Sequence, residues 1–312
     1  MIPSIGKDGA AVNKWLYRLL MILLSAVFLF SGWKIAAYYL EGMSSQGRFD
    51  DLTQQMEDAK NQTNPPVHYI PPTLPQPTAP PTEPSMPGGE TLPPTEPPVT
   101  EPPATEPTEP TAPVILPEYA PLYLENPDLV GWIQIEGTVI NYPVMQTPND
   151  PDYYLKRDFD GDYSDWGCVY VEEFCDVFTP SDNVTIYGHH MYDGSMFTAL
   201  TYYNDRDFLE AHPHIIFNTL LERHTYEIIA VFTTTASLGE GFRYNAFVNA
   251  ANEREFDEYI RQCKNLSLYR ISSTAEYGDK LITLSTCEYT QVNGRFVVVA
   301  KRILTEPATP TE

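Results

Sequence analysis

The sequence predicts a mostly β domain of eight strands with a few helices, joined through a proline-rich segment to one membrane-spanning helix. Three observations predict this arrangement. Residues 15–40 are strongly apolar, twenty of the thirty prolines lie in residues 65–117, and short apolar stretches separated by turns fill residues 118–304. A chain of 312 residues could hold two average domains, but so uneven a distribution favours one.

The N-terminal region has the composition of a membrane anchor. Residues 19–33 carry no charge, and the apolar character continues past Lys34 to Leu40, close to the roughly 20 residues that cross a bilayer. A cleaved secretory signal has a similar pattern, but no A-x-A-like cleavage site follows. Basic residues precede the span, so the positive-inside rule predicts a cytoplasmic segment 1–14, a span over 15–40 and an extracellular remainder.

The segment 65–117 is predicted to be a disordered linker rich in Pro, Thr and Glu, because such a composition cannot bury a core. It favours extended polyproline II and so predicts a spacer that lifts the next domain off the membrane. Residues 41–64 form a polar juxtamembrane segment, with a short helix expected over 50–60. Residues 305–312 are predicted to be a disordered tail.

The charge excludes nucleic acid as a partner. The formal net charge is −23, and no Lys or Arg lies between Lys60 and Lys156. Phosphate contacts need a basic face, which no region supplies. From Glu118 onward 30 acidic residues face 13 basic ones, so a cationic or amine-bearing partner would be attracted.

The domain over residues 118–304 has eight expected strands, and strands at this spacing predict a closed barrel or a sandwich. The strands are 131–135, 139–144, 168–172, 184–187, 214–219, 226–235, 280–286 and 295–304. Helices are expected over 121–126, 196–203 and 253–265.

The four cysteines have different surroundings in the sequence. Cys263 lies on the apolar stripe of an expected helix, which indicates a buried small hydrophobe. Cys168 and Cys175 flank an apolar stretch and could be core residues or a disulfide. Cys287 has polar neighbours at the mouth of a strand, and antiparallel pairing with the following strand would bring it close to Arg295.

A histidine near Cys287 would complete a nucleophilic site, because a thiol attacks as its thiolate and neighbouring cations favour that form. His189, which follows an apolar strand, is the best candidate, and His190 is its rival. Arg295 could instead be a surface residue that pairs with Glu288. From the residues alone, a Cys-His-Arg site is therefore one of several interpretations.

Two motifs resemble those of sortases. The segment TLSTC at 283–287, followed by Arg295, resembles the TLxTC motif and arginine-bearing strand of that family, and IYGHHMYDGSMF resembles the segment in which the catalytic histidine follows Gly188. Similarity also lies in 126–146, in YYL at 153–155 and in the helix before Cys287, which looks like class B. The resemblance covers roughly residues 118–304. It departs from class B at Pro151, where Asn is common, and in the segment 168–170.

The resemblance implies an eight-stranded sortase-type β-barrel and an extracellular cysteine transpeptidase. Cys287 would be the nucleophile, His189 the acid and base, and Arg295 the cation that holds the substrate backbone or the oxyanion. Secreted proteins with an NPxT-like or related C-terminal sorting signal would be the substrates. A peptidoglycan or lipid II peptide amine, or a pilin lysine, would be the acceptor. Ser285, Glu288 and Leu155 are expected to contact the substrate.

No cofactor or metal is expected. The acidic turn Asp158, Asp160, Asp162 and Asp165 lacks the spaced Glu of an EF-hand. Two other hypotheses are open. The chain could be another cysteine transpeptidase of wall peptides, such as an L,D-transpeptidase, although the Ser-His-Gly-Cys style signature of those enzymes is absent. It could also be a non-catalytic tethered surface module.

Overall fold

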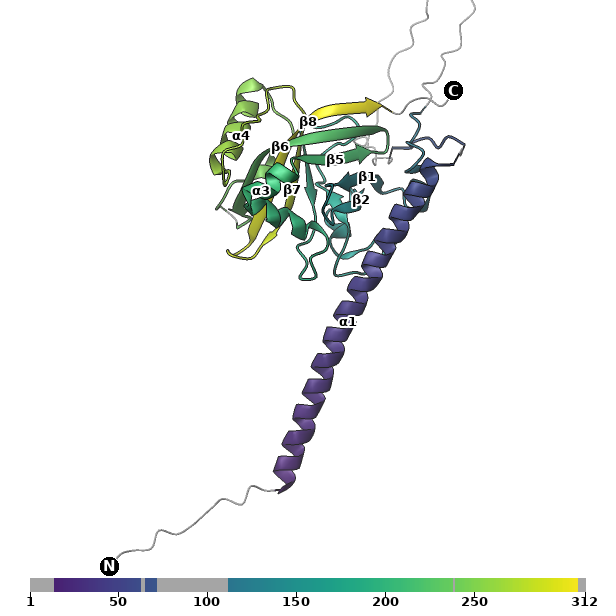
Figure 1. Ribbon diagram of the computed structural model, residues 1–312, viewed down its shortest axis with the longest axis vertical. Coiled ribbons are helices and arrows are strands. Elements are labelled where there is room, and N and C mark those ends of the chain that lie inside the picture. Colours follow the sequence, from purple (N-terminus) through teal and green to yellow (C-terminus); the bar gives the residue numbers. More distant parts are fainter. Residues whose placement is uncertain (1–13, 63–64, 72–111, 238, 308–312) are drawn as a thin grey trace, which may run out of the picture.

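Eight strands close into one barrel in the order β1-β2-β3-β4-β7-β8-β6-β5, in a computed structural model that describes residues 14–62, 65–71, 112–237 and 239–307 (Figure 1). The closed order confirms the predicted barrel and excludes the sandwich. The strands are β1 (Leu129–Gln134), β2 (Asn141–Met145), β3 (Val169–Val171), β4 (Asn183–Tyr187), β5 (His214–Thr219), β6 (Glu222–Thr235), β7 (Leu281–Glu288) and β8 (Gly294–Pro307).

The pairing of β4, β7 and β8 decides which residues meet at one end of the barrel. β4 and β7 are parallel, with Tyr187 opposite Ser285, so both strands end on the same side. β8 is antiparallel to β7 and therefore begins on that side. β6 is antiparallel to β8 and also ends there, with Thr235 opposite Gly294. Four strand ends thus surround one region.

Helices and turns cover the outside of the barrel. α4 (Glu253–Leu266) begins at Asn252, whose side chain accepts a hydrogen bond from the backbone N–H of Glu255. Its apolar face packs on β6, β7 and β8, and Cys263 is buried there as predicted. The other elements are α2 (Ala120–Glu125), α3 (Arg206–Ala211), and the 3₁₀ turns η1 (Tyr153–Lys156), η2 (Phe197–Asn204) and η3 (Tyr244–Ala246).

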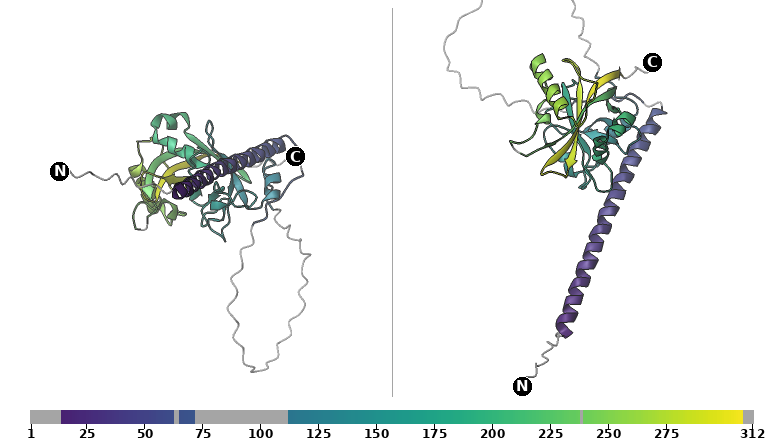
Figure 2. Two further views of the ribbon diagram at one scale, coloured as in Figure 1. Left: turned by 90° about the horizontal axis from the view of Figure 1, so that it is seen from below. Right: turned by 60° about the vertical axis from the view of Figure 1, so that its left-hand side comes forward.

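Helix α1 (Lys14–Lys60) has two halves with different surroundings. The first half is exposed and apolar, and among the described residues it forms the one helix long and apolar enough to cross a membrane. The second half lies along the barrel (Figure 2, right). Phe49, Leu52 and Met56 are buried in the main core, and Arg48 forms ion pairs with Glu125 and Asp160. The polar segment after the apolar run is therefore part of the folded domain.

The ends of the proline-rich segment meet on the domain, so the predicted spacer between membrane and domain is wrong. The backbone N–H of Tyr69 donates to Pro113 at 2.9 Å, and that of Ile115 donates to Val67 at 2.8 Å. The segment thus leaves and rejoins the folded domain, because α1 is already docked before it begins. Residues 305–307 of the predicted tail 305–312 are part of strand β8, so that part of the prediction is wrong. Most of the predicted linker (72–111), residues 1–13 of the predicted cytoplasmic end 1–14 and residues 308–312 of the tail lie outside the described residues.

The four cysteines are free thiols, and three of them are buried. Cys168 and Cys175 lie in the core and are not paired, so of their two sequence interpretations the structure selects core packing. Burial raises the pKa of both Cys175 and Cys263 to about 12, which keeps them as unreactive thiols. Cys287 is the partly exposed one.

Leu52→Ala tests the docking of α1. Leu52 is fully buried, so the substitution leaves a cavity and should lower the free energy of unfolding by about 2–5 kcal/mol. The measurement is chemical denaturation of the detergent-solubilised chain. Gln54→Ala, on the exposed side of the same helix, should change it by less than about 0.5 kcal/mol. Similar small effects of both substitutions would contradict the docking.

Candidate active site

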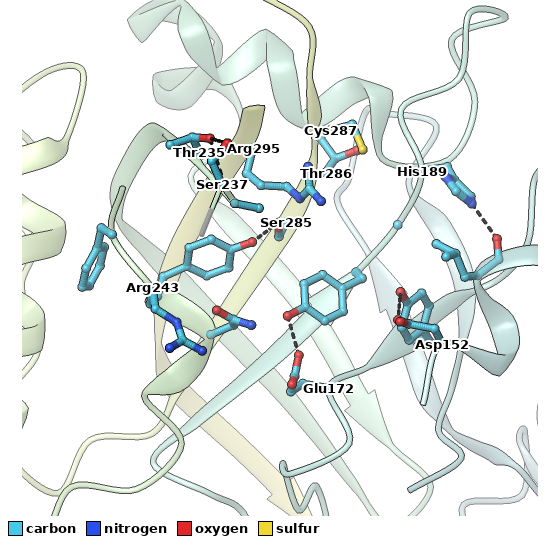
Figure 3. Close-up of a pocket in the computed structure, with 18 of the residues that line it drawn as sticks. Asp152, Glu172, His189, Thr235, Ser237, Arg243, Ser285, Thr286, Cys287 and Arg295 are labelled. Carbon is cyan, nitrogen blue, oxygen red and sulfur yellow. Dashed lines mark hydrogen bonds between the residues drawn. The ribbon is translucent and has the colours of Figure 1, made fainter. Parts of the chain in front are cut away.

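A pocket of about 760 Å³ opens where β4, β6 and β7 end and β8 begins (Figure 3). It contains charged groups of both signs beside aromatic rings. The lining residues that carry the argument are Leu155, Tyr187, His189, Ser285, Cys287 and Arg295. The structure therefore brings the three predicted catalytic residues into one pocket.

Cys287 and Arg295 face each other across the β7–β8 ladder. They are direct partners in the antiparallel register, so their side chains leave the sheet on the same face. The predicted approach of these two residues is confirmed. The Arg295 guanidinium donates through Nη1 to its own strand at Gly294 O (2.9 Å), which leaves other N–H groups of its fork for a ligand.

His189 lies across the pocket from this pair, directly after β4 (Figure 3). Its Nε2 lies 2.6 Å from the carbonyl oxygen of Leu155 in η1. A carbonyl only accepts hydrogen bonds, so Nε2 carries the proton and Nδ1 keeps its lone pair in the neutral ring. Burial lowers the pKa of His189, against the opposing effect of the Leu155 hydrogen bond. The ring therefore rests neutral near pH 7 and can accept a proton through Nδ1.

The backbone of Gly167 lies close against the Leu155 carbonyl. This glycine has φ of +58°, and a Cβ at this position would lie 2.6 Å from the carbonyl oxygens of both Tyr154 and Leu155. A glycine is therefore required for two reasons, the left-handed backbone and the close approach of η1. Sequence reasoning did not assign this role, because it depends on two segments that meet only in the fold.

His190, the rival histidine, contacts the backbone of Cys287. Its Nδ1 lies 2.9 Å from the carbonyl oxygen of Cys287, and its ring lies 5.0 Å from that of Tyr289. It is not among the residues that line the pocket. His190 is thus placed to fix the backbone at the end of β7, whereas His189 faces the space where a substrate would lie.

Two of the three predicted substrate contacts line the pocket. Leu155 does so beside His189, and Ser285 does so on β7, where its Oγ lies 2.6 Å from the hydroxyl of Tyr244. Glu288 is not a lining residue. Its carboxylate accepts hydrogen bonds from the backbone N–H and the hydroxyl of Thr290, so it organises the β7–β8 turn.

The pocket also contains carboxylates that sequence reasoning missed. Asp152, Glu172 and Glu173 line it together with Tyr187, whose hydroxyl donates to Glu172. Burial raises the pKa of Glu172 above its usual range. Asp152 directly precedes η1, Glu172 and Glu173 follow β3, and Tyr187 ends β4, so no local pattern in the sequence joins them. The sequence signal for these carboxylates was the excess of acidic over basic residues in the domain.

The acidic turn after η1 has a structural explanation. Asp158 accepts hydrogen bonds from the backbone N–H groups of Asp160 and Asp162, and Asp160 also pairs with Arg48 of α1. Within the described residues, no cluster of three or more His, Cys, Asp or Glu side chains has the arrangement of a metal site.

Comparison with known proteins agrees with this geometry. A model of the sortase domain matches residues 133–303. Sortase B of Listeria monocytogenes is 35% identical over 185 residues, which cover 57% of this chain and 71% of the relative. Sortase B of Staphylococcus aureus is 30% identical over 191 residues, covering 61% and 76%. The structure of the S. aureus sortase B–substrate complex superposes with a TM-score of 0.56 at 29% identity, covering 61% of this chain and 86% of that one.

A closed eight-stranded barrel with a cysteine opposite an arginine at its mouth defines a cysteine transpeptidase of the sortase type. The chain belongs to the sortase family, and its relatives are class B enzymes. The non-catalytic surface module and the L,D-transpeptidase are thereby excluded.

Gly167→Ala should disturb His189 through the Leu155 carbonyl. The added Cβ displaces that carbonyl, the hydrogen bond to Nε2 weakens, and the pKa of His189 falls further because the bond favours the charged ring. Titration of the His189 ring signals by NMR measures this. Gly194→Ala is the matched control: it has φ of +86° but nothing within 4 Å of the added Cβ. An unchanged His189 pKa in folded Gly167→Ala would contradict the positioning role.

Proposed function

We propose that this enzyme cleaves a C-terminal sorting signal of secreted proteins, of NPxT-like or related sequence, and transfers the protein to an amine of the cell wall. The observation that carries the proposal is the register that sets Cys287 opposite Arg295, in a pocket that also contains His189. In this proposal Cys287 is the nucleophile, His189 the acid and base, and Arg295 the cationic substrate contact.

The first half-reaction forms a thioester and releases an amine. The thiol proton of Cys287 passes to Nδ1 of His189, and the thiolate attacks the carbonyl carbon of the scissile peptide bond. The oxyanion of the tetrahedral intermediate would be stabilised by Arg295, which stays charged throughout. The C–N bond then breaks, and the departing amine takes the proton from His189. The acyl group remains on the sulfur.

The second half-reaction reverses these roles. An incoming amine attacks the thioester carbonyl and gives its proton to His189, and the Cys287 thiolate leaves as the new peptide bond forms. The carboxylates of Asp152, Glu172 and Glu173 support an amine as the acceptor, because they attract a cation to the same pocket. The peptide amine of peptidoglycan or lipid II is the proposed acceptor.

The proposed topology has residues 1–14 in the cytoplasm, residues 15–40 across the membrane and the catalytic domain outside the cell. The basic residues before the span and the exposed apolar half of α1 support it. Residues 41–60, docked on the barrel, would bind the catalytic domain directly to the anchor.

Substitution of each histidine tests the assignment of roles. His189→Ala should reduce cleavage of sorting-motif peptides by about 10²–10⁴-fold, because the acid and base are lost, whereas His190→Ala should keep activity within about tenfold. The measurement is kcat/KM on a small NPxT-type peptide library, with products identified by mass spectrometry. Cys287→Ala gives the inactive reference. Full activity of Cys287→Ala would overturn the proposed function, and equal losses for the two histidines would overturn the choice between them.

A further inference from the structure

Three large side chains stand exposed beside the catalytic pocket. Tyr192, Tyr289 and Val292 are 89%, 60% and 80% exposed, and we call them the mouth patch. The rings of Tyr192 and Tyr289 stack with an interplanar angle of 10° and a centroid distance of 6.1 Å. The stacked rings thus join two loops distant in sequence, one after β4 and one between β7 and β8, and Val292 lies in the second of these loops.

The mouth patch is directly connected to the nucleophile candidate. The hydroxyl of Tyr289 donates to the carbonyl oxygen of His190 at 3.0 Å, and the His190 ring in turn contacts the carbonyl of Cys287. Hydrogen bonds thus join the patch through His190 to the end of β7, the strand that carries Cys287.

The mouth patch is also connected to the end of the apolar half of α1. Tyr38 packs on Trp166 with ring centroids 4.8 Å apart, and the space beside Gly42 is filled by the same indole. The indole Nε1 of Trp166 donates to Asp193, the residue that follows Tyr192, at 3.0 Å. The backbone N–H of Asp165 donates to Glu41 at 2.8 Å. These contacts place Asp193, and with it the loop that carries Tyr192, beside the last turn of the apolar segment.

The view of the whole molecule agrees with these contacts. In Figure 1 the end of β7 and the start of β8 lie on the side of the barrel toward which the N-terminal half of α1 extends. Next to the part of α1 that contacts the domain, the apolar side chains of Tyr39, Leu40 and Met43 are still exposed.

We propose that the mouth patch rests on the outer lipid surface of the membrane that holds α1, with the entrance of the catalytic pocket facing that surface. The inference depends on the proposed membrane anchor. Tyrosine rings favour the membrane–water interface, where their apolar faces leave water while their hydroxyls remain hydrated. A span that ends near Leu40 puts the interface at the level of Tyr38 and so beside Tyr192.

The charges next to the mouth patch are compatible with this position. The carboxylate of Asp193 accepts hydrogen bonds from Ser195 and Trp166, and that of Glu288 accepts them from Thr290. Both acidic groups beside the patch are thus partly satisfied within the protein. A strongly anionic surface would still repel the acidic domain, so a zwitterionic surface is the appropriate test membrane.

The orientation restricts which substrates arrive at Cys287. A pocket that opens toward lipid is accessible to peptide segments held at the membrane surface. It is less accessible to peptides dissolved in the surrounding solution. Signal and acceptor would then meet in a layer instead of in bulk solution, which raises their effective concentration near the thiolate.

Site-directed spin labelling of the full chain in phosphatidylcholine nanodiscs tests this orientation. Cys287→Ala removes the exposed thiol, and the other three cysteines are buried, so a label attaches at an introduced cysteine. The sites are Val292→Cys in the mouth patch, Tyr277→Cys as an exposed control before the start of β7, and Phe28→Cys within the apolar half of α1. Collision rates with oxygen, which enters lipid, and with a water-soluble nickel chelate are compared.

We expect the label at 292 to show several-fold less contact with the nickel chelate than the label at 277, and the label at 28 to contact oxygen. Equal access of the chelate to 292 and 277, with 28 in lipid, would overturn the orientation and leave the anchor standing. A label at 28 that is open to the chelate would overturn the anchor and the orientation together.

Discussion

Cys287 and Arg295 meet because β7 and β8 are direct antiparallel neighbours, and the rest of the site depends on this register. A shift by one residue would turn Cys287 to the other face of the sheet. The register is stabilised by the closed barrel, in which the partners of β7 and β8 are themselves paired, so no free edge allows slippage. The parallel pairing of β4 with β7 then brings the residues after Tyr187, including His189, to the same end.

Much of the barrel and its mouth could be predicted from the sequence. The alternation of short apolar stretches and turns located all eight strands within a few residues, and the TLSTC segment with its following arginine located the pocket. The apolar spacing of residues 256–263 predicted the buried position of Cys263. These features are local, so one chain carries enough information to identify them.

Features that depend on distant contacts could not be predicted in the same way. From its composition, segment 41–64 was predicted to be polar. Phe49, Leu52 and Met56 nevertheless recur there at helical spacing and form the stripe that docks on the barrel. The Gly167 support of Leu155 and the Glu172–Tyr187 pair each join segments from different elements. The segment predicted as a linker contains Ile115 and Leu116, which are buried in the main core, because composition contains no information on where the ends of such a segment attach.

The docked half of α1 changes how the catalytic domain relates to the proposed anchor. A flexible spacer would let the pocket sample many orientations, whereas buried contacts and the Arg48 ion pairs give one. The docked helix is expected to reduce the mobility of the catalytic domain, and substrate and acceptor then reach the pocket from one fixed direction. The enzyme thus combines a barrel that fixes the chemistry with a helix that fixes its direction.

The most direct test of the account is intact-protein mass spectrometry of the enzyme during turnover of a sorting-motif peptide, followed by peptide mapping. We expect a transient adduct with the mass of the acyl portion of the peptide, located on Cys287 and removed by an added amine. Turnover without an adduct on Cys287, or with the adduct on another residue, would contradict it.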